Sequence, residues 1–423
     1  MNLNFVVGLL ALTVCHTALF AQTVEDRVKQ LEAQIRAMQL EVEQIKKAPA
    51  TGDPFAGLQK KPESGLNFRF YGESKYKWTK GADGNYFDPN RFVLIPSFKV
   101  NDWIIFNSEI EIEHGGAQGD STGRFFNGEL EIEQFYADFL LSKHFNIRSP
   151  GISLIPMGRV NQRHEPTTFY SVDRPRLYQE IIPSTWMEGS LGGVWGNIGE
   201  GLKYETLVST GITERTSNFI TGDAGMRKAR PRLYNKDDTT DELGYSAKLT
   251  YTGIPGLEAS ASGYVTEFGG SLDRSVTAGA WDVEASYRPR WAKRLELRGD
   301  FAMWHFGNKE NLSANNDAST TNDVGNRMYG WYAEAAYDVW PESWRHGKGS
   351  VMRLVPFVRY ADIHTTSGAY ASGLTKTYSS NKDYLTGGFA WFLSDHVVLK
   401  SDYTACLSKN SDSIFSIGIG FDF

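Results

Sequence analysis

Four arginines lie in and just before a long polar segment, residues 161–190. Guanidinium groups form paired hydrogen bonds with planar oxyanions such as phosphate and carboxylate. The segment also carries tyrosine, phenylalanine and isoleucine, which favour folding against other parts of the protein over exposure to water. We therefore predict an anion-attracting constriction formed by Arg159, Arg163, Arg174 and Arg176. In the alternative interpretation, acidic residues pair with these arginines and only fix the segment: Glu165, Asp173, Glu180 and Glu188.

Charged residues also alternate along several predicted strands, and a period of two places them on one face of a strand. An acidic set on two neighbouring strands comprises Glu109, Glu111, Glu113, Glu129, Glu131 and Glu133. A basic set on the first and thirteenth predicted strands comprises Arg69, Lys75, Lys77, Arg353 and Arg359. If both sets line a pore, walls of opposite charge create a transverse field that filters ions. In the alternative, the charges neutralise each other in cross-strand salt bridges.

The sequence carries no enzyme signature. His164 is followed by Glu165 but lacks the second histidine that a zinc-binding helix needs. No glycine motif for nucleotide binding stands between a strand and a helix. His305 and His364 are isolated candidates for an outer-membrane hydrolase, a class that uses a Ser–His pair. We predict no catalytic residue, no metal site and no cofactor.

The carboxy-terminal residues 413–423 form a strand with one apolar face. Phenylalanine and isoleucine alternate there with serine, glycine and aspartate, and the chain ends on Phe423. An apolar edge strand is an aggregation hazard in a soluble protein. A membrane barrel, in contrast, closes by pairing its last strand with its first. The tail therefore predicts a transmembrane barrel.

The amino-terminal region predicts export and self-association. Residues 1–21 read as a signal peptide, because their apolar run is too short to span a bilayer as a helix. Residues 22–47 carry a strict heptad of Val, Leu, Ile and Met, which indicates a coiled-coil helix; an exposed amphipathic helix is the alternative. Residues 48–65 form a linker rich in proline, glycine and charge.

Residues 66–423 read as strands separated alternately by short turns and long polar loops. Seven short and eight long connections predict an all-β fold, a 16-stranded antiparallel barrel. A soluble sandwich would show the same alternation, with its apolar face as the core. Aromatic residues beside the short turns favour the membrane barrel, in which they form an interfacial girdle. They are Trp103, Tyr251, Trp291, Trp340 and Phe392.

Composition excludes some functions. The formal net charge of −6 gives no support for nucleic-acid binding. Cleavage after residue 21 would leave Cys406 as the single cysteine, so the mature chain could form no internal disulfide.

Two local sequences resemble the phosphate-selective porin O and P family. They are Gly158-Arg159-Val160-Asn161-Gln162, leading into Arg174, and Pro183-Ser184-Thr185-Trp186. The resemblance is loose over 66–423 and best over 155–196. It implies a trimer of channels that pass small anions passively. That family lines its pore with an arginine ladder and a lysine cluster, whereas the clearest ladder here is glutamate.

These features predict a bacterial outer-membrane porin that forms a water-filled channel for passive diffusion of small hydrophilic solutes. Anions such as phosphate or carboxylates would be favoured. We expect a homotrimer in outer-membrane lipid, with the amino-terminal helix in the periplasm and no nucleic-acid partner. The alternatives are an outer-membrane hydrolase, and a structural tether that joins the outer membrane to peptidoglycan through the coiled coil.

Overall fold

The computed structural model describes residues 65–79, 84–116, 128–212, 225–227, 243–268, 275–311, 325–369, 381–408 and 413–423. The predicted signal peptide and heptad helix lie outside these residues. So does the predicted linker, except for its last residue, Gly65. No helix in the described residues is long and apolar enough to cross a membrane.

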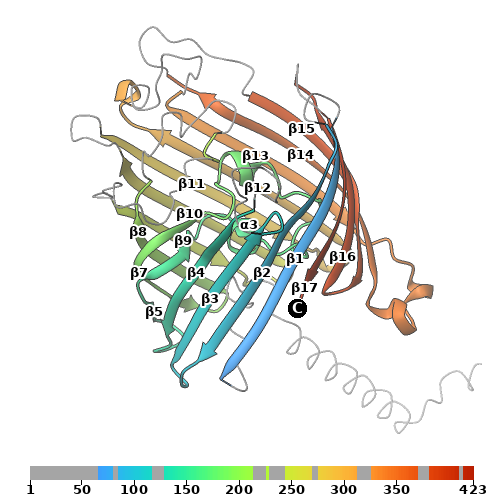
Figure 1. The fold of residues 1–423 in the computed structure, drawn as a ribbon, viewed down its shortest axis with the longest axis horizontal. Coiled ribbons are helices and arrows are strands. Elements are labelled where there is room, and N and C mark those ends of the chain that lie inside the picture. Colours follow the sequence, from blue (N-terminus) through green and yellow to red (C-terminus); the bar gives the residue numbers. More distant parts are fainter. Residues whose placement is uncertain are drawn as a thin grey trace, which may run out of the picture. The chain divides into compact units, whose positions relative to one another are not determined.

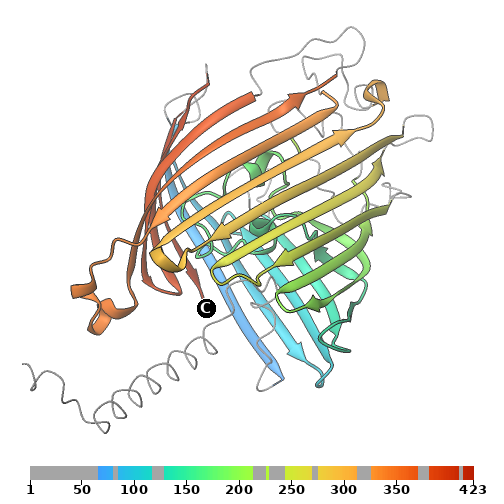
Figure 2. The ribbon, with the colours of Figure 1, turned by 180° about the vertical axis from the view of Figure 1, so that it is seen from behind.

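The described strands close into one antiparallel ring (Figures 1 and 2). Apart from β5 and β6, which do not pair with each other, each strand pairs with its sequence neighbours, and β17 pairs with β1. Of the 17 strands, β5 and β6 share one position in the wall, because both pair with β4 and β7. Pro150 stands between them and has no N–H for the ladder. The ring therefore has 16 positions, and the predicted barrel is confirmed.

The strands of the first half are β1 (Leu66–Thr79), β2 (Tyr86–Lys99), β3 (Ile104–Glu113), β4 (Leu130–Phe139), β5 (Asn146–Arg148), β6 (Gly151–Leu154), β7 (Met187–Gly199) and β8 (Leu202–Thr210). Those of the second half are β9 (Leu243–Tyr251), β10 (Leu257–Phe268), β11 (Val276–Tyr287), β12 (Leu295–Phe306), β13 (Arg327–Tyr337), β14 (Arg353–Ser367), β15 (Asn381–Ser394), β16 (Val397–Cys406) and β17 (Ile414–Asp422). Short helical turns are α3 (Arg159–Gln162), α4 (Leu177–Glu180), η2 (Arg290–Ala292), η3 (Glu342–Trp344) and η4 (Gly347–Val351).

The barrel wall is apolar outside and polar inside. On β17, Phe415, Ile417 and Ile419 are about 40% exposed, whereas the alternating Ser416 is 2% exposed. Buried charged residues occur on many strands, among them Arg91, Glu133, Asp282, Arg359 and Lys400. A soluble sandwich would bury the apolar face instead, so that alternative is wrong. An outward apolar belt around a closed ring is the arrangement that lipid requires, because closure leaves no unpaired strand edge.

The predicted aromatic girdle is confirmed in part. Trp103, Tyr251 and Trp291 are 48%, 39% and 82% exposed beside short connections. The prediction is wrong for two others. Phe392 shares the inner face with buried Ala390, where the Arg353 guanidinium covers its ring at 4.0 Å. Trp340 is 9% exposed: its ring packs against Trp344, and its indole N–H donates to the Gly349 carbonyl of the β13–β14 connection.

The tail closes the barrel as predicted. Phe423 and Phe70 exchange two backbone hydrogen bonds of 2.8 Å each, and their ring centroids lie 5.3 Å apart. The small residues of β17 face inward for a steric reason. A Cβ on Gly420 would lie 2.4 Å from Pro166, and one on Gly418 would lie 3.2 Å from Val172. Pro166 and Val172 belong to the chain between β6 and β7. This chain packs so closely against β17 that glycine is needed at the inward positions there.

Candidate functional site

The chain between β6 and β7, residues 155–186, lies within the ring of strands in both ribbon views (Figures 1 and 2). We call it the lumen segment. Its two ends are joined by a hydrogen bond of 2.8 Å from the Ile155 N–H to the Trp186 carbonyl. Asn161 reinforces this link between the two ends, since its side-chain amide donates to the Ile155 carbonyl and its side-chain oxygen accepts from the Trp186 N–H. Gly158 has a positive φ of 71°, and a side chain there would strike Tyr178.

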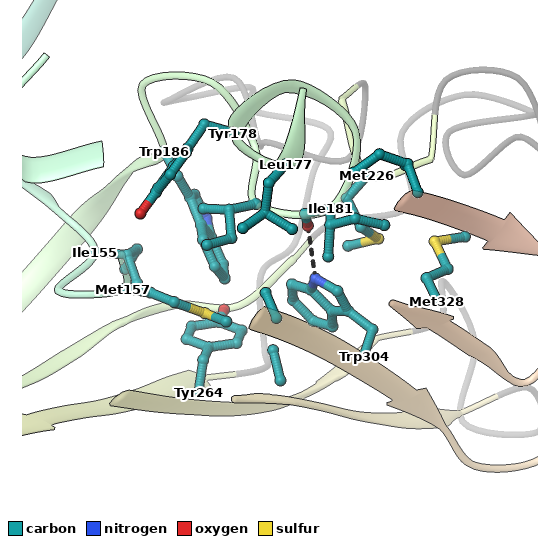
Figure 3. Packing of buried hydrophobic residues seen from close by; sticks show 14 of the residues in the cluster. Ile155, Met157, Leu177, Tyr178, Ile181, Trp186, Met226, Tyr264, Trp304 and Met328 are labelled. Atoms are coloured by element: carbon teal, nitrogen blue, oxygen red, sulfur yellow. Dashed lines mark hydrogen bonds between the residues drawn. The ribbon is translucent and has the colours of Figure 1, made fainter. Parts of the chain in front are cut away.

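One apolar cluster holds the lumen segment against β10–β14, as Figure 3 shows. Trp186 is fully buried between Tyr264 and Trp304, with ring-centroid distances of 4.6 Å and 5.5 Å. The Trp304 indole N–H donates to the Ile181 carbonyl at 2.8 Å. The segment supplies the rest of its side of the cluster through Ile155, Met157, Val160, Leu177, Tyr178, Ile181 and Ile182. The apolar content of the segment is thus explained by its position in the lumen.

Polar contacts tie the lumen segment to the same wall. Arg163 forms an ion pair with Glu258 of β10. The Arg159 backbone N–H and the Tyr178 hydroxyl donate to one Glu284 oxygen, at 2.8 Å and 3.1 Å. The Arg159 guanidinium makes no ion pair among the described residues.

On the other side, the lumen segment is fastened to β1, β14 and β16. Asp173 accepts from Lys75 at 3.1 Å and pairs with Lys77 at 2.5 Å. Burial alone would raise the pKa of Asp173, but the two lysine charges outweigh it and hold that pKa well below the ordinary value. Lys400 donates to the Ser171 carbonyl at 3.0 Å, and Arg359 donates to the Ser171 hydroxyl at 2.9 Å.

A cavity of about 880 Å³ lies between the lumen segment and the loop-side ends of β1–β3. Its lining includes six basic side chains, Lys75, Lys77, Arg91, Arg174, Arg176 and Arg227, and four acidic ones, Glu73, Asp88, Glu113 and Asp173. The lining therefore has two more basic than acidic groups.

Arg174 is a cation of this cavity that is held by hydroxyl groups and not by a carboxylate. It donates to the Ser184 and Thr185 hydroxyls at 2.9 Å and 2.8 Å, and it makes no ion pair among the described residues. Burial and the neighbouring Arg91 charge lower the pKa of Arg174, which is the expected effect on a cation without a close counter-ion. Arg176 differs, because it pairs with Glu180 at 3.5 Å and lies over the Tyr384 ring at 5.1 Å.

The structure thus brings Arg174 and Arg176 together at the cavity and places Arg163 in an ion pair with Glu258. The alternative pairing within the segment holds for Glu180. Glu165 lies instead 3.7 Å from Arg69, while Glu188 accepts from Trp186 and Thr210.

The other predicted basic residues mostly contact carboxylates. Arg69 reaches Asp422 at 3.4 Å, Arg353 reaches Asp395 at 3.7 Å and Arg359 reaches Glu334 at 2.5 Å. These three pairs lie within the barrel wall and its turns, whereas Lys75 and Lys77 pair with Asp173 of the lumen segment.

The acidic set does not form one uniform wall. Glu109, Glu111 and Glu133 are 3%, 1% and 0% exposed, whereas Glu113 and Glu131 are half-buried and Glu129 is exposed. Two of the buried members meet the lumen segment directly: His164 Nε2 lies 3.6 Å from Glu109 and 3.4 Å from Glu133. Burial and the Arg174 charge lower the pKa of His164, but the two carboxylates outweigh them and raise it to about 9.

Several important residues were missed by sequence reasoning. Arg91 of β2 contacts Glu73 at 2.9 Å and Glu111 at 3.8 Å, and it donates to the His164 carbonyl at 2.5 Å. Lys400 is buried over the Phe169 ring at 3.7 Å. Both lie at inward positions of period-two strands, and that period was the signal available in the sequence.

The two hydrolase candidates lack a nucleophile among their contacts. His364 lies 2.7 Å from Asp362 and stacks on Tyr329 at 4.5 Å. His305 is exposed on β12. Neither has a serine hydroxyl contact among the described residues.

No family model matches the chain. An uncharacterized protein of Aquifex aeolicus (strain VF5) is 29% identical over 371 residues, which cover 84% of this chain and 80% of that protein. Three solved structures each align with 85% of this chain. Salmonella typhi OmpF in complex with daunomycin is 12% identical, with a TM-score of 0.56 over 97% of that chain. The anion-selective porin from Comamonas acidovorans is 11% identical, with a TM-score of 0.50 over 99%. The outer membrane channel DcaP of Acinetobacter baumannii is 12% identical, with a TM-score of 0.50 over 97%. These likenesses show the fold.

Proposed function

We propose that this protein is an outer-membrane porin through which small hydrophilic solutes diffuse passively, with small anions favoured. The observation that carries the proposal is Arg174, a half-buried cation with hydroxyl partners, on a segment that narrows the lumen beside a cavity of about 880 Å³. Charge counts for more in such a narrowed, lower-dielectric passage. The solved structures of similar fold, titled as an anion-selective porin and an outer membrane channel, support the same class.

Phosphate and carboxylates are the anions whose geometry suits this site. Arg174 offers a planar fork, and Arg176, Lys75 and Lys77 line the same cavity. Asp173 pairs with both lysines, so it limits how strongly an anion is held. A permeating solute must bind weakly enough to leave, and mixed charge at the cavity supports that requirement.

Replacing Arg174 and Arg176 with alanine should shift the channel toward cations. A unit charge about 4 Å from the solute contributes up to roughly 4 kcal/mol at an effective dielectric of 20, so the anion-to-cation permeability ratio should fall by about tenfold or more. The measurement is the single-channel reversal potential in a salt gradient. Arg174→Lys, which retains the charge, should keep the original potential. An unchanged potential in the double alanine variant would show that both arginines only fix the segment.

We also propose a homotrimer steadied by the heptad of residues 22–47, which lie outside the described residues. A three-heptad helix is marginal alone and gains stability by association. Deleting 22–47 should weaken the trimer while the barrel stays folded, because barrel-to-barrel contacts remain. Native mass measurement in mild detergent tests this expectation. Monomer alone in the full-length protein would count against the trimer, and pull-down of peptidoglycan that depends on 22–47 would favour the tether.

A further inference from the structure

Three side chains from separate parts of the chain meet where the lumen segment contacts β3 and β4. Glu109 of β3, Glu133 of β4 and His164 of the lumen segment bring one ligand atom each to within 4.8 Å of one another. Their exposed fractions are 3%, 0% and 2%. Imidazole and carboxylate are the ligands that Zn²⁺ and similar divalent ions take in proteins.

The spacing of the three atoms suits a metal ion better than direct hydrogen bonds. His164 Nε2 lies 3.4 Å from Glu133 Oε2 and 3.6 Å from Glu109 Oε1. Ordinary N–H···O hydrogen bonds have separations of about 2.7–3.2 Å. The edge of a tetrahedron with metal–ligand bonds of about 2.1 Å is roughly 3.4 Å.

The surrounding contacts orient two of the three ligands. His164 Nδ1 lies 2.9 Å from the Asn161 carbonyl, which only accepts, so Nδ1 carries the proton and Nε2 faces the carboxylates. Glu109 accepts from the Tyr71 hydroxyl at 2.8 Å and from the Gln134 amide. Metal-binding histidines and carboxylates characteristically have such supporting partners.

The third ligand is buried without hydrogen bonds. Neither Glu133 oxygen accepts one among the described residues, and His164 Nε2 has no hydrogen-bond partner there either. The two oxygens of Glu111, which interacts electrostatically with Glu133, are in the same condition. Arg91 forms an ion pair with Glu111 at 3.8 Å, but its guanidinium lies closer to Glu73, at 2.9 Å. Buried carboxylates in excess of cations are costly, and a divalent ion would compensate them.

A second acidic cluster also has oxygens without hydrogen bonds among the described residues, Asp282 Oδ2 and Asp300 Oδ1, but it differs in its ligand types and in its cation. Asp282, Glu284 and Asp300 also lie within 4.8 Å of one another. Lys248 donates to Glu284 at 3.0 Å, and Ser260 and the Arg159 N–H donate to it as well. This cluster contains no imidazole and already has its own cation, so it serves as the matched control.

We propose that Glu109, Glu133 and His164 bind a divalent transition-metal ion of the Zn²⁺ class, which fastens the lumen segment to the β3–β4 wall. Glu111 is the candidate for a fourth ligand. The site does not depend on the proposed porin function, since it rests only on the contacts between the lumen segment and β3–β4.

The test uses the full-length protein in detergent, stripped with a chelator and equilibrated with Zn²⁺, or refolded in its presence because the site is buried. We expect one tightly held Zn²⁺ per protomer by elemental analysis. Co²⁺ in its place should give the intense visible absorption of a tetrahedral site. His164→Asn keeps a group near the Asn161 carbonyl and removes Nε2, and Glu133→Gln keeps the size of the side chain. Each should weaken affinity by at least about 100-fold, because losing a supporting partner alone costs about 10–100-fold.

Controls separate this site from other metal binding. Asp282→Asn in the second cluster and His346→Asn in an exposed connection should leave the bound ion unchanged. Tyr71→Phe should weaken binding by about 10-fold or more, as expected for a supporting partner. Both ligand variants must show the β-sheet circular dichroism of the wild type. If wild-type protein holds no Zn²⁺, or if His164→Asn and Glu133→Gln bind it as tightly as the wild type, the proposal is overturned.

Discussion

Trp186→Ala should loosen the lumen segment and raise single-channel conductance. Trp186 is fully buried between Tyr264 and Trp304, and its indole N–H donates to buried Glu188 at 2.8 Å. Truncating a buried tryptophan to alanine costs about 3–5 kcal/mol, and losing a donor to a buried carboxylate adds to that cost. The segment bears most of this loss, because Trp186 belongs to the apolar cluster that packs it against β10–β14.

The measurement combines planar-bilayer conductance with thermal unfolding in detergent. The barrel should retain its β-sheet circular dichroism, since the strand ladder does not involve the indole. Trp291→Ala is the matched control, because Trp291 is 82% exposed at a short connection. It should change neither quantity. Wild-type conductance in Trp186→Ala would show that the segment does not narrow the passage.

Asp173→Asn should make the channel more anion-selective. Asp173 pairs with Lys75 at 3.1 Å and Lys77 at 2.5 Å, and all three side chains line the cavity. The amide keeps the shape of the side chain but leaves both ammonium groups without this counter-ion. At an effective dielectric of 20, one unit charge at about 4 Å contributes up to roughly 4 kcal/mol, so the anion-to-cation permeability ratio should rise by about tenfold or more.

The pH dependence of this effect follows from the lowered pKa of Asp173. Burial opposes ionisation there, but Lys75 and Lys77 outweigh it. A carboxylate whose folded-state pKa lies below the ordinary value of about 3.9 stays charged above that value and loses its charge only at still lower pH. The difference in reversal potential between wild type and Asp173→Asn should therefore persist from pH 7 down to about pH 4. Asp102→Asn, at a turn on the opposite end, should match the wild type. Disappearance of the difference near pH 6 would contradict the assigned pairing.

The closed 16-position barrel was predictable because each strand has its own local signal. Period-two alternation, short turns and the apolar tail need no knowledge of distant contacts. The local pattern did not show whether the apolar face of each strand points outward to lipid or inward to a core. Phe415, Ile417 and Ile419 would alternate with Ser416 in the same way in a soluble sandwich, and only their exposure in the closed ring decides between the two.

The candidate site was predictable as a segment but not as a set of contacts. Arg174 and Arg176 do line a cavity, yet Arg163 pairs with Glu258, 95 residues away in the chain. Asp173 pairs with lysines of β1 rather than with its neighbouring arginines. Such pairings depend on how the segment crosses the lumen, and charge type alone does not fix them.

By itself, the sequence determined the strands, their number, the closing tail and the chemical character of the lumen segment. Tertiary structure alone decided which charges meet. At β3–β4 a bulge sets Glu109 opposite Gln134 and Ile110 opposite Ile132, which leaves Glu133 without a ladder partner. That shift, with His164 arriving from the lumen segment, assembles the Glu109–Glu133–His164 cluster from three distant parts of the chain. Polar and apolar residues alternate along a single strand and can be recognised there. The register between strands and the path of the lumen segment depend on packing between elements, which no local pattern shows.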